Sequence, residues 1–165
     1  WAAHPNSPVH HDGQVYFTSG YGLGGVMLRL SEDGARATEA WTNKTPDTHH
    51  GGVVLVDGHI YGSQSRGRWA CVSWKDGRTK WVSRKREKGS IIAADGMLIT
   101  YDENTRRGTV ALAKATPDGY QRVSEFRITK GDGPHWAHPV IADGRLYIRH
   151  GKFLMAFEVG KAKDG

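Results

Sequence analysis

The stretch WAHPVIADGRLYIRH, residues 136–150, decides the fold because it holds two short strand-like runs around one tight turn. Residues 140–142 and 146–148 are rich in β-branched and aromatic side chains, which favour strands. Asp143-Gly144 between them is typical of a two-residue hairpin loop, since such a loop needs positive φ angles. The stretch therefore predicts a β-hairpin with histidines just before it.

The same pattern occurs four times along the chain. Asp-Gly pairs lie between apolar runs at residues 12–13, 57–58, 95–96 and 143–144, and each unit continues into a third apolar run. In three units a polar turn leads to a fourth run that is closed by an aromatic residue: Trp41, Trp81 or Phe126. Four antiparallel strands in a repeat of roughly 40 residues are typical of a β-propeller blade. The sequence therefore predicts an all-β fold, a partial β-propeller without helices.

We expect a single partial β-propeller domain over residues 1–165, with an incomplete last blade. The expected blades are 6–45, 46–86, 87–133 and 134–165. Closed propellers have about 4 to 8 blades, and an open stack leaves strand edges unpaired. The remaining blades are expected as partners, supplied by the same chain, by another chain or by an oligomer of this one. The chain begins with Trp1 rather than Met, which favours a mature or trimmed product.

Charge and cysteine content exclude several classes of protein. Lys and Arg number 23 against 17 Asp and Glu, a formal charge of +6. The positive residues are spread along the chain, which favours a basic solvated surface and argues against nucleic acid as the partner. The single cysteine, Cys71, excludes an intrachain disulfide, and its apolar neighbours predict a buried thiol. No apolar run reaches the ~20 residues of a transmembrane helix.

Several stretches resemble the PQQ-like (pyrroloquinoline-quinone-like) β-propeller repeat proteins, and most closely the C-terminal half of a bacterial branch of that family. They are residues 7–9, 19–22, 49–55, 93–98, 115–120 and 136–150. The family is related in fold to quinoprotein alcohol dehydrogenases and to an outer-membrane assembly lipoprotein. The resemblance implies a propeller fold and a periplasmic or extracellular location.

The resemblance also implies how blades dock. In the family, a tryptophan that closes the repeat stacks between neighbouring blades. The second unit comes closest to this pattern at Trp81, although the residues that support the tryptophan by hydrogen bonds are replaced. Trp41 and Phe126 match the pattern in the aromatic side chain alone.

The resemblance carries no cofactor over to this chain. Dehydrogenases of the family hold the quinone and a calcium ion with Glu, Asn and Asp, and many stack the quinone on a disulfide between neighbouring cysteines. This chain has one cysteine and no match to the calcium ligands, so we predict no cofactor. PQQ and calcium belong to the alternative interpretation, a quinoprotein-type alcohol dehydrogenase whose other half supplies the ligands.

Blade topology predicts where a site lies. Successive strands reverse direction, so the segment before the first strand and the turn between the second and third strands share one rim, opposite the Asp-Gly turns. Equivalent positions before the four first strands are His4, His49, Glu87 and His135. Zinc accepts such ligands, but positions spread round a ring axis do not converge, so a metal-binding propeller is the second alternative.

The ligand-binding candidates on this rim are mainly His and Arg. They are His4, His49, His50, Arg66, Arg68, Glu87, His135, Trp136, His138, Arg149 and His150. Guanidinium groups beside aromatic rings suit carboxylates, phosphates or sugars. We therefore favour a non-catalytic module that binds a partner protein or an anionic or sugar-like ligand on this face.

Overall fold

The computed structural model describes residues 5–103 and 108–159, and the regular elements in these ranges are β strands. The strands are β1 (Val9–His11), β2 (Gln14–Ser19), β3 (Gly24–Leu30), β4 (Ala37–Asn43), β5 (Val53–Val56), β6 (His59–Ser63), β7 (Trp69–Ser73), β8 (Thr79–Val82), β9 (Gly89–Ala94), β10 (Met97–Asp102), β11 (Thr109–Lys114), β12 (Arg122–Arg127), β13 (Val140–Ala142), β14 (Arg145–His150) and β15 (Phe153–Glu158). Among the described residues, no helix is long and apolar enough to cross a lipid bilayer.

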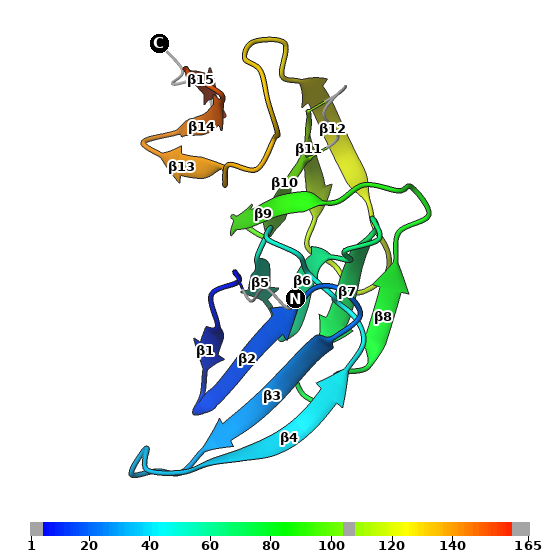
Figure 1. The fold of residues 1–165 in the computed structure, drawn as a ribbon, viewed down its shortest axis with the longest axis vertical. Coiled ribbons are helices and arrows are strands. Elements are labelled where there is room, and N and C mark those ends of the chain that lie inside the picture. Colours follow the sequence, from blue (N-terminus) through cyan, green and yellow to red (C-terminus); the bar gives the residue numbers. More distant parts are fainter. Residues whose placement is uncertain (1–4, 104–107, 160–165) are drawn as a thin grey trace.

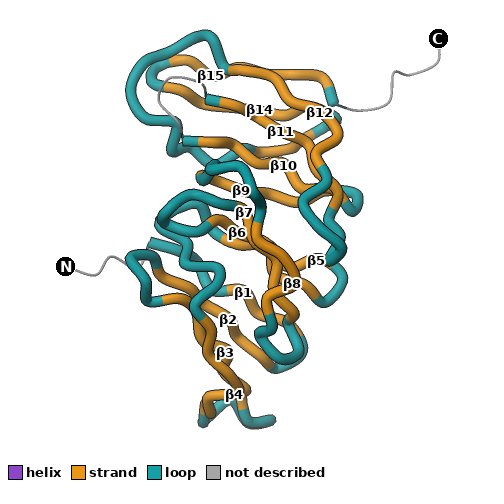
Figure 2. The backbone as a smooth tube through the Cα atoms, turned by 90° about the vertical axis from the view of Figure 1, so that its right-hand side faces the viewer, coloured by secondary structure: helices purple, strands orange, loops and turns teal. Residues whose placement is uncertain are grey.

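The strands form four antiparallel sheets, each built from strands that follow one another in the chain. The sheets are β1–β4, β5–β8, β9–β12 and the three-stranded β13–β15. The first strand of each sheet lies on the left of Figure 1, and β4, β8 and β12 lie on the right. Figure 2 shows the sheets following one another along the long axis. The predicted all-β partial propeller is confirmed.

The hairpins turn where the Asp-Gly pairs predict. The four Asp residues, Asp12, Asp57, Asp95 and Asp143, have φ angles between 46° and 50°, and the Gly after each has φ between 66° and 71°. Two consecutive left-handed residues in a two-residue loop define a type I′ turn, whose twist matches that of the flanking strands. The turns therefore set the register of the first two strands in every sheet.

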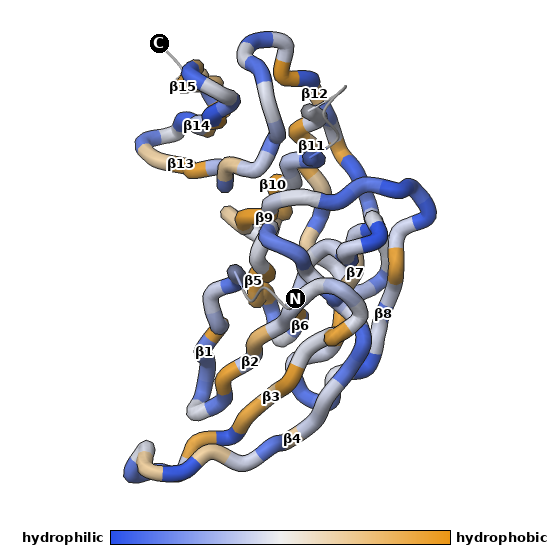
Figure 3. Tube along the Cα trace, viewed as in Figure 1, coloured by the Kyte–Doolittle hydropathy of each residue, from blue (hydrophilic) through white to orange (hydrophobic). Residues whose placement is uncertain are grey.

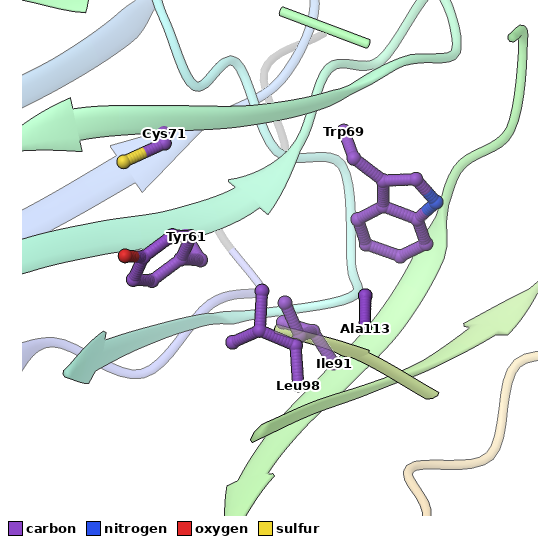
Figure 4. Close-up of a cluster of buried hydrophobic side chains, with 6 residues drawn as sticks. All are labelled: Tyr61, Trp69, Cys71, Ile91, Leu98 and Ala113. Atoms are coloured by element: carbon purple, nitrogen blue, oxygen red, sulfur yellow. The ribbon is translucent and has the colours of Figure 1, made fainter. Parts of the chain in front are cut away.

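The core lies between the sheets. Apolar residues are concentrated in the strands and polar residues in the connections (Figure 3). Figure 4 shows the cluster between the second and third sheets, formed by Tyr61, Trp69, Cys71, Ile91, Leu98 and Ala113. Cys71 is fully buried, as predicted, and burial raises the pKa of its thiol to about 11. Similar clusters join the first sheet to the second and the third to the fourth.

The closing tryptophans bond to the next sheet. The indole N–H of Trp41 donates to the carbonyl of Trp74 at 3.2 Å, and that of Trp81 donates to the carbonyl of Thr116 at 2.8 Å. Both acceptors follow the third strand of the neighbouring sheet. The first and second sheets are thus each tied to the next one by a hydrogen bond at an equivalent place, because the strand order is the same.

The aromatic rings also fill the space between sheets. The Trp81 ring lies between Tyr61 and Tyr120, with ring centroids 6.0 and 5.8 Å away. Phe126 packs on Phe157 of the fourth sheet at 4.6 Å. A phenyl ring has no N–H to donate, so Phe126 contacts its neighbour through the ring alone.

Gly77 lets the Trp41 ring approach the second sheet. A Cβ atom at Gly77 would lie 2.5 Å from that ring, whereas a Cβ at Gly34 has no heavy atom within 4 Å. Both glycines follow an Asp in the turn before a fourth strand, and both have φ of 68°. The two positions therefore share a backbone conformation, but only Gly77 has an aromatic ring beside it.

We expect Gly77→Ala to destabilise the protein more than Gly34→Ala. The left-handed backbone costs either alanine about 1–2 kcal/mol. Overpacking against Trp41 adds about 1–3 kcal/mol at Gly77 alone. Urea denaturation gives both free energies of unfolding. Equal losses in the two variants would show that the Trp41 contact does not hold the sheets together.

Candidate functional site

One rim of the propeller gathers polar and aromatic side chains from all four blades. We define the rim cluster as Tyr21, His49, His50, Lys88, Glu103, Trp136 and His138. Tyr21 belongs to the β2–β3 turn and Glu103 follows β10, while the other members precede β5, β9 or β13. These are the segments that blade topology places opposite the Asp-Gly turns. Each member contacts another, as the following distances show.

Tyr21 and His49 join the first two blades. The Tyr21 hydroxyl lies 2.8 Å from Nε2 of His49, and the two rings meet edge to face at 5.1 Å. Tyr21 has a φ of 62°, a conformation that bulky residues rarely adopt, and Gly22 N–H donates to Asp47 Oδ1 at 3.2 Å. Burial and the neighbouring His50 lower the pKa of His49. This lowered pKa favours the neutral form of the His49 ring.

Glu103 is the only carboxylate among the seven rim-cluster residues. It accepts a hydrogen bond from His50 Nε2, and Lys88 Nζ lies 2.7 Å from its Oε1. Burial alone would raise the pKa of the Glu103 carboxyl, but these hydrogen bonds and the charges of Lys88 and His50 lower it to about 2. Glu103 is thus ionised at physiological pH, and Lys88 offsets its charge.

Trp136 and His138 bring the fourth blade to the cluster. The Trp136 ring lies 5.4 Å from that of His50, and Trp136 is 55% exposed. His138 Nε2 lies 3.1 Å from the backbone carbonyl of His50, to which it donates when protonated there. Beside them is a cavity of ≈ 300 Å³. It is lined by His50 and His138 and by residues in or just before the first strands of the first three sheets, β1, β5 and β9.

Asn6 also lines this cavity, and its side-chain amide bonds to the backbone near the two histidines. Its nitrogen donates to the carbonyl of Thr48 at 2.8 Å, and its oxygen accepts from Gly52 N–H at 3.0 Å. The side chain thereby links the segment before β1 to both ends of the His49-His50 pair. These two hydrogen bonds fix the backbone on both sides of His49 and His50.

Two predicted candidates, His135 and His150, form a buried pair beside the rim cluster. His135 is 2% exposed, and its ring stacks on that of His150 at 3.8 Å. The Tyr101 hydroxyl contacts Nδ1 of His135. Burial, with His150 beside it, lowers the pKa of His135. The pair packs the fourth blade on the third and is not accessible to a ligand.

The other candidates are dispersed. Glu87 is buried and ion-paired with Arg122 and with Lys85, the latter at 2.8 Å. Arg66 and Arg68 are exposed in the connection between β6 and β7, and Arg149 is exposed near the end of β14. His4 lies outside the described residues. Among the described residues, the equivalent positions His49, Glu87 and His135 therefore do not come together in one site.

His49 instead meets two residues from other positions. Among the described residues, His49, His50 and Glu103 form one group of metal-ligand side chains, whose ligand atoms lie within 4.8 Å of one another. Sequence reasoning missed Glu103 and Lys88. The signal was present, because both lie in segments that the same topological rule assigns to this rim.

We expect Glu87 to stabilise the fold rather than to bind a ligand. Glu87→Gln removes the negative charge that faces a largely buried Arg122, so the free energy of unfolding should fall by about 1–3 kcal/mol. Glu158→Gln is the control, because that side chain is 87% exposed and 4.0 Å from its cationic neighbour. Thermal or urea unfolding measures both. A loss no greater than that of the control would contradict a structural ion pair.

Comparison with known proteins identifies relatives of the fold. Residues 3–83 match the family model described as outer membrane protein assembly factor BamB. Comparison with curated protein sequences found no match. BamB from Moraxella catarrhalis is similar with a TM-score of 0.69 and 12% identity, over 94% of this chain and 43% of that one.

Two enzymes share the architecture. Quinohemoprotein alcohol dehydrogenase from Comamonas testosteroni is similar with a TM-score of 0.68 and 15% identity, over 88% of this chain and 29% of that one. Glutaminyl cyclase from Myxococcus xanthus is similar with a TM-score of 0.54 and 18% identity, over 96% of this chain and 69% of that one. The chain thus spans less than half the length of BamB and of the dehydrogenase. At these identities the similarity establishes the fold alone.

Proposed function

Since the chain is a PQQ-like β-propeller repeat protein, we propose that it is a non-catalytic binding module whose rim cluster takes an anionic, sugar-like ligand. One observation carries this proposal. Side chains from four blades converge on the rim, and the cluster leaves two large aromatic residues, Tyr21 and Trp136, 62% and 55% exposed. Exposed aromatic rings beside fixed polar groups have no role in burying the core.

The chemistry of the cluster suits a ring with hydroxyl and carboxylate groups. The faces of Tyr21 and Trp136 offer apolar stacking surfaces, and the Tyr21 hydroxyl reaches His49. His49 and His138 offer ring nitrogens to hydroxyl groups, and Lys88 offers a positive charge to a carboxylate. The one negative charge in the cluster is already offset, so an anion meets no uncompensated repulsion.

The quinoprotein alternative does not fit the described rim. Calcium takes about 6 to 8 oxygen ligands, whereas the rim cluster offers imidazole nitrogens and one carboxylate. The single cysteine is buried in the core and cannot form a neighbouring disulfide for the quinone to stack on. We therefore derive no redox step. Dye-linked alcohol oxidation after adding PQQ and calcium to the full protein would overturn the non-catalytic proposal.

A cell-envelope location and further blades belong to the same proposal. The matching family model describes an outer membrane assembly factor, which supports a periplasmic or extracellular binding protein that also has a protein partner.

The first sheet exposes an apolar groove of ≈ 820 Å³ beside Phe17 and Leu23, and β15 exposes Leu154. Further blades of the ring would cover both faces. Chain 1–165 should then bind an apolar dye, and a form with added blades should bind less.

We expect Trp136→Ala to weaken binding of acidic oligosaccharides such as oligogalacturonate by about five- to tenfold, because it removes the stacking surface. Lys88→Gln should weaken the same ligand by about tenfold and leave neutral maltooligosaccharides unaffected, since it removes only a charge. Isothermal titration calorimetry measures the affinities. His59→Ala, beside the Asp57-Gly58 turn on the opposite rim, is the control. Binding that survives Trp136→Ala unchanged would place the ligand elsewhere.

A further inference from the structure

We infer that His49, His50 and Glu103 bind a divalent transition metal ion of the zinc class on the rim between the second and third blades. This inference goes beyond the organic ligand proposed above, because the ion is held by protein side chains alone. It also differs from the four-position metal site that the sequence left as the second alternative. The donors come from two consecutive residues of one blade and one turn of the next.

The geometry brings the donors within reach of one ion. The three ligand atoms lie within 4.8 Å of one another. Zinc bound tetrahedrally at ~2.0–2.1 Å separates its ligand atoms by roughly 3.3 Å. Rotation of the three side chains is the movement that would close this difference. The ion would replace the direct His50–Glu103 hydrogen bond and separate those two atoms.

The donor types select the metal. Two imidazoles and one carboxylate are the ligands of zinc, iron, cobalt and nickel sites. Calcium and magnesium prefer oxygen ligands, of which this group has one carboxylate. Three protein ligands also leave a coordination position free. A ligand bound to the rim cluster would have access to that position.

The side chains of His49 and Glu103 contact neighbours outside the group, and the backbone of His50 does so too. The Tyr21 hydroxyl lies 2.8 Å from Nε2 of His49, and Lys88 Nζ lies 2.7 Å from Glu103. His138 reaches the backbone carbonyl of His50 at 3.1 Å. A partner such as the Tyr21 hydroxyl orients a ligand histidine and raises the affinity of a site, whereas the Lys88 ammonium competes with the ion for Glu103. Part of the arrangement that a metal site needs is present without the ion.

A purely structural ion pair explains only half of the group. Lys88, His50 and Glu103 satisfy one another and join the second blade to the third. That network gives no reason for His49 to place a ring nitrogen within 4.8 Å of the same carboxylate. Metal binding accounts for both halves together.

Zinc binding to the full protein, stripped of metal by dialysis against a chelator, tests the inference. Wild type should bind one equivalent in calorimetry, and calcium or magnesium should not displace it. His49→Ala and Glu103→Gln should each weaken zinc binding by more than about tenfold, and Tyr21→Phe by about tenfold. His59→Ala, away from the site, should have no effect. Equal losses for His59→Ala and His49→Ala would overturn the inference, because they indicate nonspecific binding to surface histidines.

The variant Lys88→Gln distinguishes metal binding from anion binding, because it should change the two affinities in opposite directions. Its positive charge competes with a metal ion for Glu103, so its removal should tighten zinc binding by about three- to tenfold. The same variant weakens acidic sugars under the function proposed above. Unchanged or weaker zinc binding in Lys88→Gln would overturn the metal site.

Cobalt(II) substitution and Trp136→Ala complete the test. Bound cobalt should show visible absorption bands of a tetrahedral or five-coordinate site, which His49→Ala abolishes while its urea unfolding curve shows that it remains folded. An octahedral spectrum would overturn the inference. Trp136→Ala should retain zinc binding. In the wild-type protein, absence of zinc binding with acidic-sugar binding present overturns this inference alone. Absence of acidic-sugar binding with zinc binding present overturns the proposed function alone.

Discussion

A four-stranded sheet with two apolar faces must bury both of them, and this constraint organises the whole chain. No sheet here can do so by itself, so each packs on the next through a shared core. The closing aromatic residues strengthen this packing in the same place each time. Trp41 and Trp81 add an indole hydrogen bond to a carbonyl of the following sheet. Stability is therefore distributed between neighbours, as in other repeat proteins.

Stacking the sheets also creates the rim cluster. Because every sheet runs in the same strand order, the segments before the first strands and the turns after the second strands come to one rim. That rim receives Tyr21, His49, Glu103 and Trp136 from four different blades. Loops that a rigid scaffold places together are where binding functions usually lie. The site is thus a consequence of the packing that stabilises the fold.

The same packing separates structural polar residues from accessible ones. Glu87 and His49 occupy equivalent positions before a first strand, but Glu87 is enclosed by an ion pair with Arg122, whereas His49 stays half-buried beside Tyr21. His135 occupies the equivalent position in the fourth blade and is buried, with its ring stacked on that of His150. An equivalent position in the repeat predicts on which rim the backbone of a residue lies. It does not predict which way the side chain turns, because that depends on the neighbour from the next blade.

The sequence by itself determined the repeat, the strands and their turns. These follow from local chemistry: alternating apolar runs favour strands, and Asp-Gly pairs tolerate the positive φ angles of a type I′ turn. Only the tertiary structure decided the composition of the site. Glu103 lies 53 residues beyond His50 along the chain, and no local pattern shows that these two side chains meet. Their contact depends on the docking of one blade on the next, which is a property of the packed sheets.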